Sequence, residues 1–134
     1  MVKQIFVNLP IGNLKASMAF YAALGFKNNP HFTNDDAACM VYSDTIYVML
    51  QSHHSWRRFT DRPIPPSTSS EVMLALSVDS IQEVGTLNDI ATANGGTADI
   101  NPKQDLGFMY SRAFTDPDGH IWEPFWMDPA AIPA

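Results

Sequence analysis

The sequence is poor in several features that mark particular classes of protein. It contains a single cysteine, Cys39, so no disulfide can form within the chain, and this fits a reducing compartment. Lysine and arginine number 8 against 14 acidic residues and are dispersed, so the basic face that nucleic-acid binding requires is missing. No apolar run approaches the length of a membrane span, and nothing near the N-terminus resembles a signal peptide. We therefore expect a soluble, cytoplasmic protein.

The composition favours a folded globular chain. Of 134 residues, 46% are hydrophobic and only 16% are charged, which argues against disorder and suits one compact domain or two small modules. The net charge of −6 would favour cationic ligands, although solubility alone also explains it. Cys39 lies in the apolar stretch 37–41, and we expect a small buried hydrophobe there rather than a nucleophile.

The two halves of the chain repeat one order of elements: a strand, a helix and three further strands. In the first half the pattern predicts strands at 3–9, 26–27, 37–42 and 45–51, with a helix that opens at Gly12-Asn13 and closes at Gly25. In the second half it predicts strands at 71–78, 97–100, 108–114 and 120–127, with a helix that opens at Ser80 and closes at 94–96. Residues 53–70 contain Pro and Ser clusters and are predicted to form a connecting loop.

The last predicted strand carries one carboxylate among bulky apolar residues. Because strand side chains alternate, Ile121, Glu123, Phe125 and Met127 share one face. A carboxylate on such a face is costly to bury unless it has a partner or a chemical role, so Glu123 is the first candidate functional residue.

The paired βαβββ pattern and the closing segment Asp116-Pro-Asp-Gly-His-Ile-Trp-Glu123 resemble the vicinal oxygen chelate superfamily, which includes glyoxalase lyases, bleomycin-resistance proteins and ring-cleaving dioxygenases. Segments 14–26 and 76–79 carry the resemblance further, and it covers essentially the whole chain. It implies an α+β fold in which two βαβββ modules form cupped mixed sheets that enclose a groove, with the helices outside. We expect one domain with module 1 at about 1–52, a linker at about 53–70 and module 2 at about 71–128, and by analogy a homodimer.

Alternation along the strands then assigns side chains to the groove. If Ile5, Val7 and Leu9 face a helix, their neighbours on the strand face the groove, and the repeat extends this assignment to the second half. For Arg112 the sequence leaves two possibilities. If its side chain faces the groove, it would pair with Glu123 or with a substrate carboxylate. The alternative is a structural ion pair. The candidate ligand-binding residues are Gln4, Phe6, Asn8, Tyr47, Met49, Gln51, Met73, Ser77, Arg112 and Phe125.

The family's four metal-ligand positions fall on Phe6, Met49, Met73 and Glu123. Only Glu123 suits a hard or borderline divalent ion, because a thioether is soft and a phenyl ring donates nothing. We therefore expect no metal and no other cofactor, with a divalent ion kept as the less favoured possibility.

Three functions follow from the resemblance. The favoured one is a metal-free protein that binds a small cationic or aromatic molecule, as in the bleomycin-resistance branch. The alternative is a lactoylglutathione-lyase-like enzyme in which Glu123 is the catalytic residue that transfers a proton. A ring-cleaving dioxygenase comes third, because it needs a His/His/Glu iron site.

Three questions stay open at this level. The first is whether Glu123 has a functional role or is a relic bonded to polar groups such as Gln4, Asn8, Gln51 or Tyr47. The second is whether residues 52–70 cover the groove or leave it open. The third is whether Arg57 and Arg58 in that loop hold an anion or form a solvated basic pair.

Overall fold

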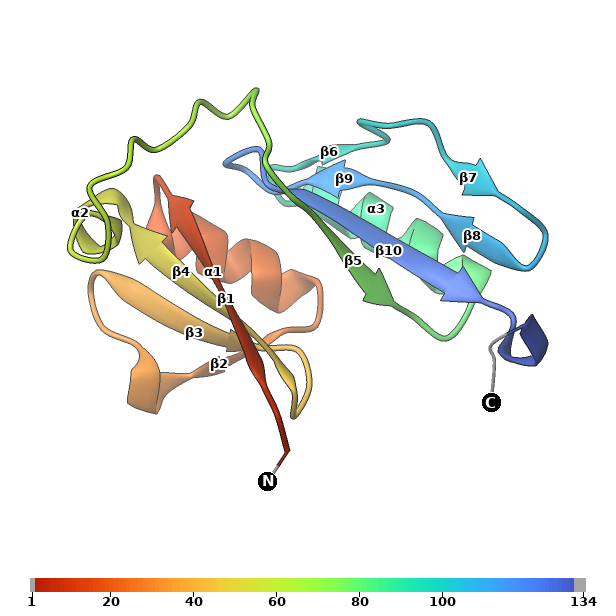
Figure 1. Ribbon diagram of the computed structural model, residues 1–134, viewed down its shortest axis with the longest axis horizontal. Helices are drawn as coiled ribbons and strands as arrows, with labels where there is room; N and C mark the ends of the chain where they lie inside the picture. The colour runs from red at the N-terminus through yellow and green to blue at the C-terminus, as the bar shows by residue number, and fades with distance from the viewer. Residues whose placement is uncertain (1, 132–134) are drawn as a thin grey trace. The chain divides into compact units, whose positions relative to one another are not determined.

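The computed structural model describes residues 2–131 and divides into two compact units, the first ending at Pro66 and the second beginning at Ser67 (Figure 1). Each unit is a mixed sheet with one long helix against one face, so the expected α+β class with two βαβββ modules is confirmed.

Unit 1 contains a four-stranded sheet in the order β1-β4-β3-β2. Its β1 edge strand runs parallel to β4, and the other neighbours are antiparallel. Its elements are β1 (Ile5–Ile11), α1 (Leu14–Ala23), β2 (Lys27–Asn29), the 3-10 turn η1 (Pro30–Phe32), β3 (Ala37–Val41), β4 (Ile46–Ser52) and the one-turn helix α2 (His53–Trp56).

Unit 2 contains a six-stranded sheet in which β10 is central. It pairs in parallel with β5 and antiparallel with β8 and β9, while β6 and β7 extend the sheet beyond β9 and β8. Its elements are β5 (Met73–Ser77), α3 (Ile81–Ala93), β6 (Thr97–Ala98), β7 (Gln104–Asp105), β8 (Met109–Ser111), β9 (Phe114–Thr115), β10 (Ile121–Met127) and the 3-10 turn η2 (Pro129–Ala131).

The helix ends follow the predicted capping residues. The Asn13 side chain accepts a hydrogen bond from the Ala16 amide at 3.0 Å, and the Ser80 hydroxyl accepts one from the Glu83 amide at 3.1 Å. Each satisfies a backbone donor that the first helical turn leaves unpaired. Beyond the C-terminus of α1, Gly25 has a φ of +103°, which a residue with a side chain rarely adopts.

Strand registers confirm the internal repeat. In unit 1 Phe6 lies opposite Tyr47, and Asn8 lies opposite Met49. At the corresponding places in unit 2, Met73 lies opposite Ile121, and Ala75 lies opposite Glu123.

The cores lie between each sheet and its helix. Side chains that alternate with the predicted groove residues are buried, which confirms the predicted parity for most of the strands. In unit 1 they include Leu9, Ile11, Val48 and Leu50, and in unit 2 Leu76, Trp122 and Pro124.

Ile5 departs from that parity, because it is 58% exposed instead of covered by a helix. Helix α1 packs on β2, β3 and β4, whereas Ile5 begins β1 at the sheet edge. A side chain at the start of an edge strand lies beyond the area that a ten-residue helix can cover.

Two predicted elements need correction, and one strand was not predicted. The segment 53–70 does not begin as a loop, because α2 forms there, with the Ser52 hydroxyl accepting a bond from the Ser55 amide at 3.1 Å. The strand expected at 108–114 is interrupted after Ser111 and becomes β8 and β9. The short strand β7 was not predicted; its two residues alone carry no alternating pattern.

Cys39 is 1% exposed, which confirms its prediction as a buried residue. Among the helices described in residues 2–131, none combines the length and apolar character that crossing a bilayer requires.

Candidate functional site

Five of the predicted ligand-binding residues lie on the sheet face of unit 1 opposite α1. We call this surface the open face; it consists of Gln4, Phe6, Asn8, Tyr47 and Met49. Gln4 and the β1 residues Phe6 and Asn8 are exposed, with Phe6 at 47%, and the two β4 residues are half-buried.

A stacked aromatic pair forms the centre of the open face. The Phe6 and Tyr47 rings are nearly parallel, with centroids 4.4 Å apart and planes inclined by 11°. The Gln4 side-chain amide donates to the Tyr47 hydroxyl at 3.0 Å and to the Asp44 carbonyl at 3.1 Å, and the Tyr47 hydroxyl donates to that same carbonyl at 3.2 Å. The Tyr47 ring is thus anchored at its polar end while an aromatic surface stays accessible.

Gln51 was predicted as a ligand-binding residue, but it is only 3% exposed. Its Nε2 donates to the Asn8 Oδ1 at 2.9 Å, and its Oε1 accepts from the Ser55 hydroxyl at 2.5 Å. Helix α2 follows β4 directly and brings Ser55, itself 2% exposed, onto Gln51. The side chain of Gln51 therefore holds Asn8 in place instead of lining the open face.

Sequence reasoning missed Ser55. The signal was present: Ser52 and Ser55 have the spacing of an N-cap and its third helical residue, which is typical of a helix start.

In unit 2 four predicted residues share the face opposite α3. Met73 and Ser77 of β5 are exposed, and Glu123 and Phe125 of β10 are half-buried. Across the strands Glu123 has Ala75 on the β5 side. On the other side the pairings of Ile121 with Thr115 and of Phe125 with Ser111 place Ala113 opposite it. Both of these cross-strand neighbours are small residues.

The ion pairs Arg58–Asp36 and Arg112–Asp99 do not include Glu123. The polar groups suggested as partners of Glu123 form bonds within unit 1: Gln4 with Tyr47, and Asn8 with Gln51.

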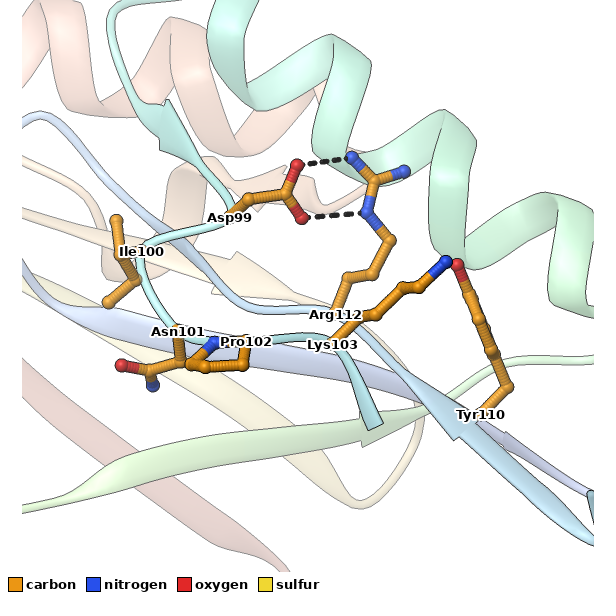
Figure 2. A pocket seen from close by; sticks show the side chains of 7 residues that line it. All are labelled: Asp99, Ile100, Asn101, Pro102, Lys103, Tyr110 and Arg112. Atoms are coloured by element: carbon orange, nitrogen blue, oxygen red, sulfur yellow. Dashed lines mark hydrogen bonds and ion pairs between the residues drawn. The ribbon is translucent and has the colours of Figure 1, made fainter. Parts of the chain in front are cut away.

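Arg112 does not belong with Glu123, which corrects the prediction that placed it in the groove. Ser111 lies opposite Phe125, so Arg112 points to the other face, where its Nη1 lies 3.5 Å from the Cβ position of Gly85 on α3. There it donates to Asp99 through Nε at 2.8 Å and Nη2 at 2.7 Å (Figure 2). The alternative that the sequence left open, a structural ion pair, is the observed one.

This ion pair borders a shallow pocket of about 610 Å³. The hydrogen bond from Arg112 lowers the pKa of Asp99, and the same bond raises the pKa of Arg112. Asp99 also adopts a φ of +54°, which aspartate tolerates better than most residues. The pocket is lined by Asp99, Ile100, Asn101, Pro102, Lys103, Tyr110 and Arg112 (Figure 2).

Asp116 gives the closing motif a structural role. Its buried carboxylate accepts hydrogen bonds from the Asp118 amide at 3.0 Å and the His120 amide at 2.9 Å. Gly119 completes this turn with a φ of +88°. The turn fixes the start of β10 and therefore the position of Glu123 on the sheet.

The side chains at the four metal-ligand positions predicted from the resemblance offer a divalent ion a single oxygen-bearing ligand. Of Phe6, Met49, Met73 and Glu123, only Glu123 carries an oxygen ligand, whereas a catalytic zinc needs three protein ligands and octahedral metals need several oxygens. In the part of the chain that the structure describes, no three His, Cys, Asp or Glu side chains are grouped as a metal would require.

Comparisons with known proteins agree with this architecture. The family model Glyoxalase/Bleomycin resistance protein/Dioxygenase superfamily matches residues 3–123. No curated protein sequence matches the chain.

Solved structures of similar fold cover nearly the whole chain. The hypothetical protein SA1046 from S. aureus is 26% identical with a TM-score of 0.78, covering 94% of this chain and 95% of its own. A glyoxalase/bleomycin resistance protein/dioxygenase family enzyme from Burkholderia phytofirmans PsJN is 17% identical with a TM-score of 0.76, covering 94% and 99%. A bleomycin-binding protein complexed with bleomycin is 19% identical with a TM-score of 0.62, covering 93% and 98%.

Since the family model spans most of the sequence, this chain belongs to the glyoxalase/bleomycin resistance protein/dioxygenase superfamily.

Proposed function

We propose that this protein binds a small aromatic molecule on the open face of unit 1 and works without the metal ion of its family. The observation that carries the proposal is the Phe6–Tyr47 pair, whose rings are stacked while Phe6 stays 47% exposed. A flat ring that packs on this pair would remove apolar surface from water and gain stacking geometry.

Two further observations support this choice. Polar groups surround the rings at Gln4 and Asn8, and a few polar groups on an apolar surface are typical of small-molecule sites. The bleomycin-binding protein of similar fold is complexed with a small organic molecule.

The experiment is a titration of the whole protein, followed by the NMR signals of the Phe6 and Tyr47 rings. The probes are indane, 1-indanone and 1-aminoindane, which share one fused ring system. We expect at least one of them to shift these signals with a dissociation constant of about 1 mM, as is typical of ligands with about ten non-hydrogen atoms.

A matched pair of variants locates the binding. Phe6→Ala should weaken binding about tenfold, whereas Phe32→Ala should leave it unchanged, because Phe32 is 67% exposed but lies on η1. Failure of all three probes to shift the Phe6 and Tyr47 signals contradicts the proposal, as does unchanged binding to Phe6→Ala.

A lactoylglutathione-lyase-like reaction is the second candidate. It is favoured by the Glu123 carboxylate, which is half-buried between Ala75 and Ala113 and lies outside the ion pairs named above. In that case the Glu123 carboxylate, which has no ion-pair partner among those two pairs, could transfer a proton to or from a bound substrate.

The two candidates separate in one assay. The protein is loaded with Zn or Ni, dialysed and analysed for metal, then given the hemithioacetal of methylglyoxal and glutathione. Stoichiometric metal together with turnover that Glu123→Gln abolishes would favour the lyase. Absence of turnover, with probe binding equal in Glu123→Gln and the parent, would favour the binding protein.

We also propose that the protein forms a homodimer in the cytoplasm, as the family resemblance implies. Sedimentation equilibrium tests the dimer: a mass near twice the 14.9 kDa of one chain is expected.

A further inference from the structure

We infer that Asn8 is a specificity-determining residue of the open face, held so that it presents an N–H donor and selects aromatic ligands with a hydrogen-bond acceptor, such as a ketone or carboxylate. The inference rests on the proposed function, because it names the chemistry of the ligand that the Phe6–Tyr47 pair would bind. It depends on a chain of hydrogen bonds from α2 to β1.

The chain begins at Arg58. Its Nη2 lies 3.5 Å from the Ser55 Oγ and donates to it, and 3.8 Å from Asp36 Oδ2, which keeps the guanidinium on this side of the unit. Since the Ser55 oxygen accepts from a cation, its own hydrogen is free to point elsewhere.

The Ser55 hydrogen points to Gln51. The separation between Ser55 Oγ and Gln51 Oε1 is 2.5 Å, which is within the range of an O–H···O bond but too short for N–H···O. The oxygen of the Gln51 amide therefore faces Ser55, and its nitrogen faces Asn8 at 2.9 Å.

Asn8 must then turn its own oxygen toward Gln51. A second observation gives the same orientation: the Asn8 Nδ2 lies 3.4 Å from the Phe6 carbonyl oxygen, an atom that can only accept. Two independent neighbours thus assign the Asn8 amide, and its nitrogen is the end that remains at the surface.

Burial makes this orientation costly to reverse. Gln51 is 3% exposed and Ser55 is 2% exposed, so water cannot reach the bonds between them. A flipped Gln51 amide would place its oxygen against the Asn8 oxygen and its N–H group against the Ser55 O–H group. The Asn8 nitrogen carries two hydrogens, and within residues 2–131 it makes only the long 3.4 Å contact with the Phe6 carbonyl, so an N–H is available beside the Phe6–Tyr47 rings. All the bonds donate in the same direction, and the Arg58 charge at their origin strengthens the terminal donor.

The ligand that fits is an aromatic ring with an acceptor oxygen, neutral or anionic. The net charge of −6 by itself would favour a cation, but the group next to the rings is a donor, and a donor repels an ammonium group.

The indane series tests this directly, because its members differ only in the group at one ring position. In the parent protein we expect 1-indanone to bind about three- to tenfold more tightly than indane, and 1-aminoindane, protonated at pH 7, to bind no better than indane.

Asn8→Asp keeps the bond from Gln51 but replaces the surface N–H with an acceptor. We expect it to weaken 1-indanone about tenfold and to strengthen 1-aminoindane, which inverts the preference. Gln82→Glu is the matched control, since it makes the same chemical change on an exposed residue of α3 and should leave both affinities unchanged. Thermal melts confirm that each variant is folded.

Ser55→Ala tests whether Ser55 positions Asn8 through Gln51. Ser55 itself touches no ligand, but the substitution removes its hydrogen bond to Gln51. The ratio of 1-indanone to indane affinity should therefore fall toward one, while the affinity for indane itself stays constant. A merely structural role for Ser55 would lower all three affinities together, and that result contradicts the inference.

The outcomes also separate this inference from the proposed function. If all three probes bind at Phe6 and Tyr47 with equal affinity, or if Asn8→Asp leaves their ratios unchanged, the role of Asn8 is wrong and the aromatic site stands. If no probe binds there, both are wrong.

Discussion

The ring of Phe6 on β1 stacks on the ring of Tyr47 on β4, with centroids 4.4 Å apart. These residues lie directly opposite each other in a parallel pair of strands, although they are 41 positions apart in the chain. The stack joins an edge strand to the interior of the sheet, and it is the only place on the open face where two large rings meet.

This stack should be measurable as a coupling energy. In a double-mutant cycle of Phe6→Leu and Tyr47→Leu, we expect about 0.5–1.5 kcal/mol of coupling in the free energy of unfolding, because leucine keeps apolar area but loses ring geometry. Urea titration of the four proteins provides the values. A coupling that is indistinguishable from zero would show that the rings are neighbours without an energetic link.

Two glycines should respond to alanine in opposite directions. Gly119 has a φ of +88°, and a Cβ there would overlap the carbonyl oxygen of Ser67, so Gly119→Ala should destabilise unit 2 by about 2 kcal/mol or more. Gly85 lies inside α3, where a Cβ would meet only Arg112 Nη1 at 3.5 Å, an ordinary contact. Gly85→Ala should therefore stabilise by about 0.5–1 kcal/mol. Thermal melts of both variants test the pair, and equal shifts in one direction would contradict it.

The Asp99–Arg112 pair should make stability depend on pH. The bond from Arg112 lowers the pKa of Asp99 below its ordinary value of 3.8, so the folded state favours the ionised carboxylate. The contribution is then fully present above about pH 4 and is lost as the pH falls through the lowered pKa of the folded state.

We expect this contribution to be only about 0.2–1 kcal/mol, because the Asp99 side chain is 50% exposed and salt screens it. Asp99→Asn is the suitable variant, since asparagine also tolerates the φ of +54°. The difference in unfolding free energy between parent and variant should decrease as the pH falls below about 4, and it should also shrink in 1 M salt. A difference that stays constant on acidification would assign the effect to packing.

Asn88 offers a stabilising substitution. Its side chain on α3 is fully buried; its Nδ2 donates to the Val84 carbonyl at 3.0 Å, but its Oδ1 has no hydrogen-bond partner within residues 2–131. A buried unsatisfied oxygen costs about 1–3 kcal/mol, and leucine is also the better helix former. Asn88→Leu should therefore raise the melting temperature by several degrees, whereas Asn88→Asp should lower it sharply because it buries a charge. A lower melting temperature for Asn88→Leu would mean that the oxygen has a role.

Cys39 should be protected in the native protein. The thiol is 1% exposed, and burial raises its pKa, so both access and thiolate content are low. At pH 8 a disulfide reagent should label no thiol per folded chain and one thiol after urea unfolding. Rapid labelling of the folded protein would contradict the burial.

Much of this architecture could be predicted from the sequence because the relevant signals are local. Asn13, Ser80 and Gly25 mark helix ends through contacts with residues at most four positions away. Alternation likewise placed Phe6 and Tyr47 on one face, and the internal repeat made Ala75 the counterpart of Asn8 and Glu123 the counterpart of Met49.

The sequence by itself thus determined the order of elements, the repeat and the partition of most strand residues between core and open face. The tertiary structure decided that the Arg112 side chain lies on the sheet face that α3 covers. It also brought Ser55 into contact with Gln51 and Asp99 into contact with Arg112. Alternation says only that neighbours on a strand point apart. Which side receives a helix or a returning loop depends on contacts between residues distant in the chain, and no local pattern encodes them.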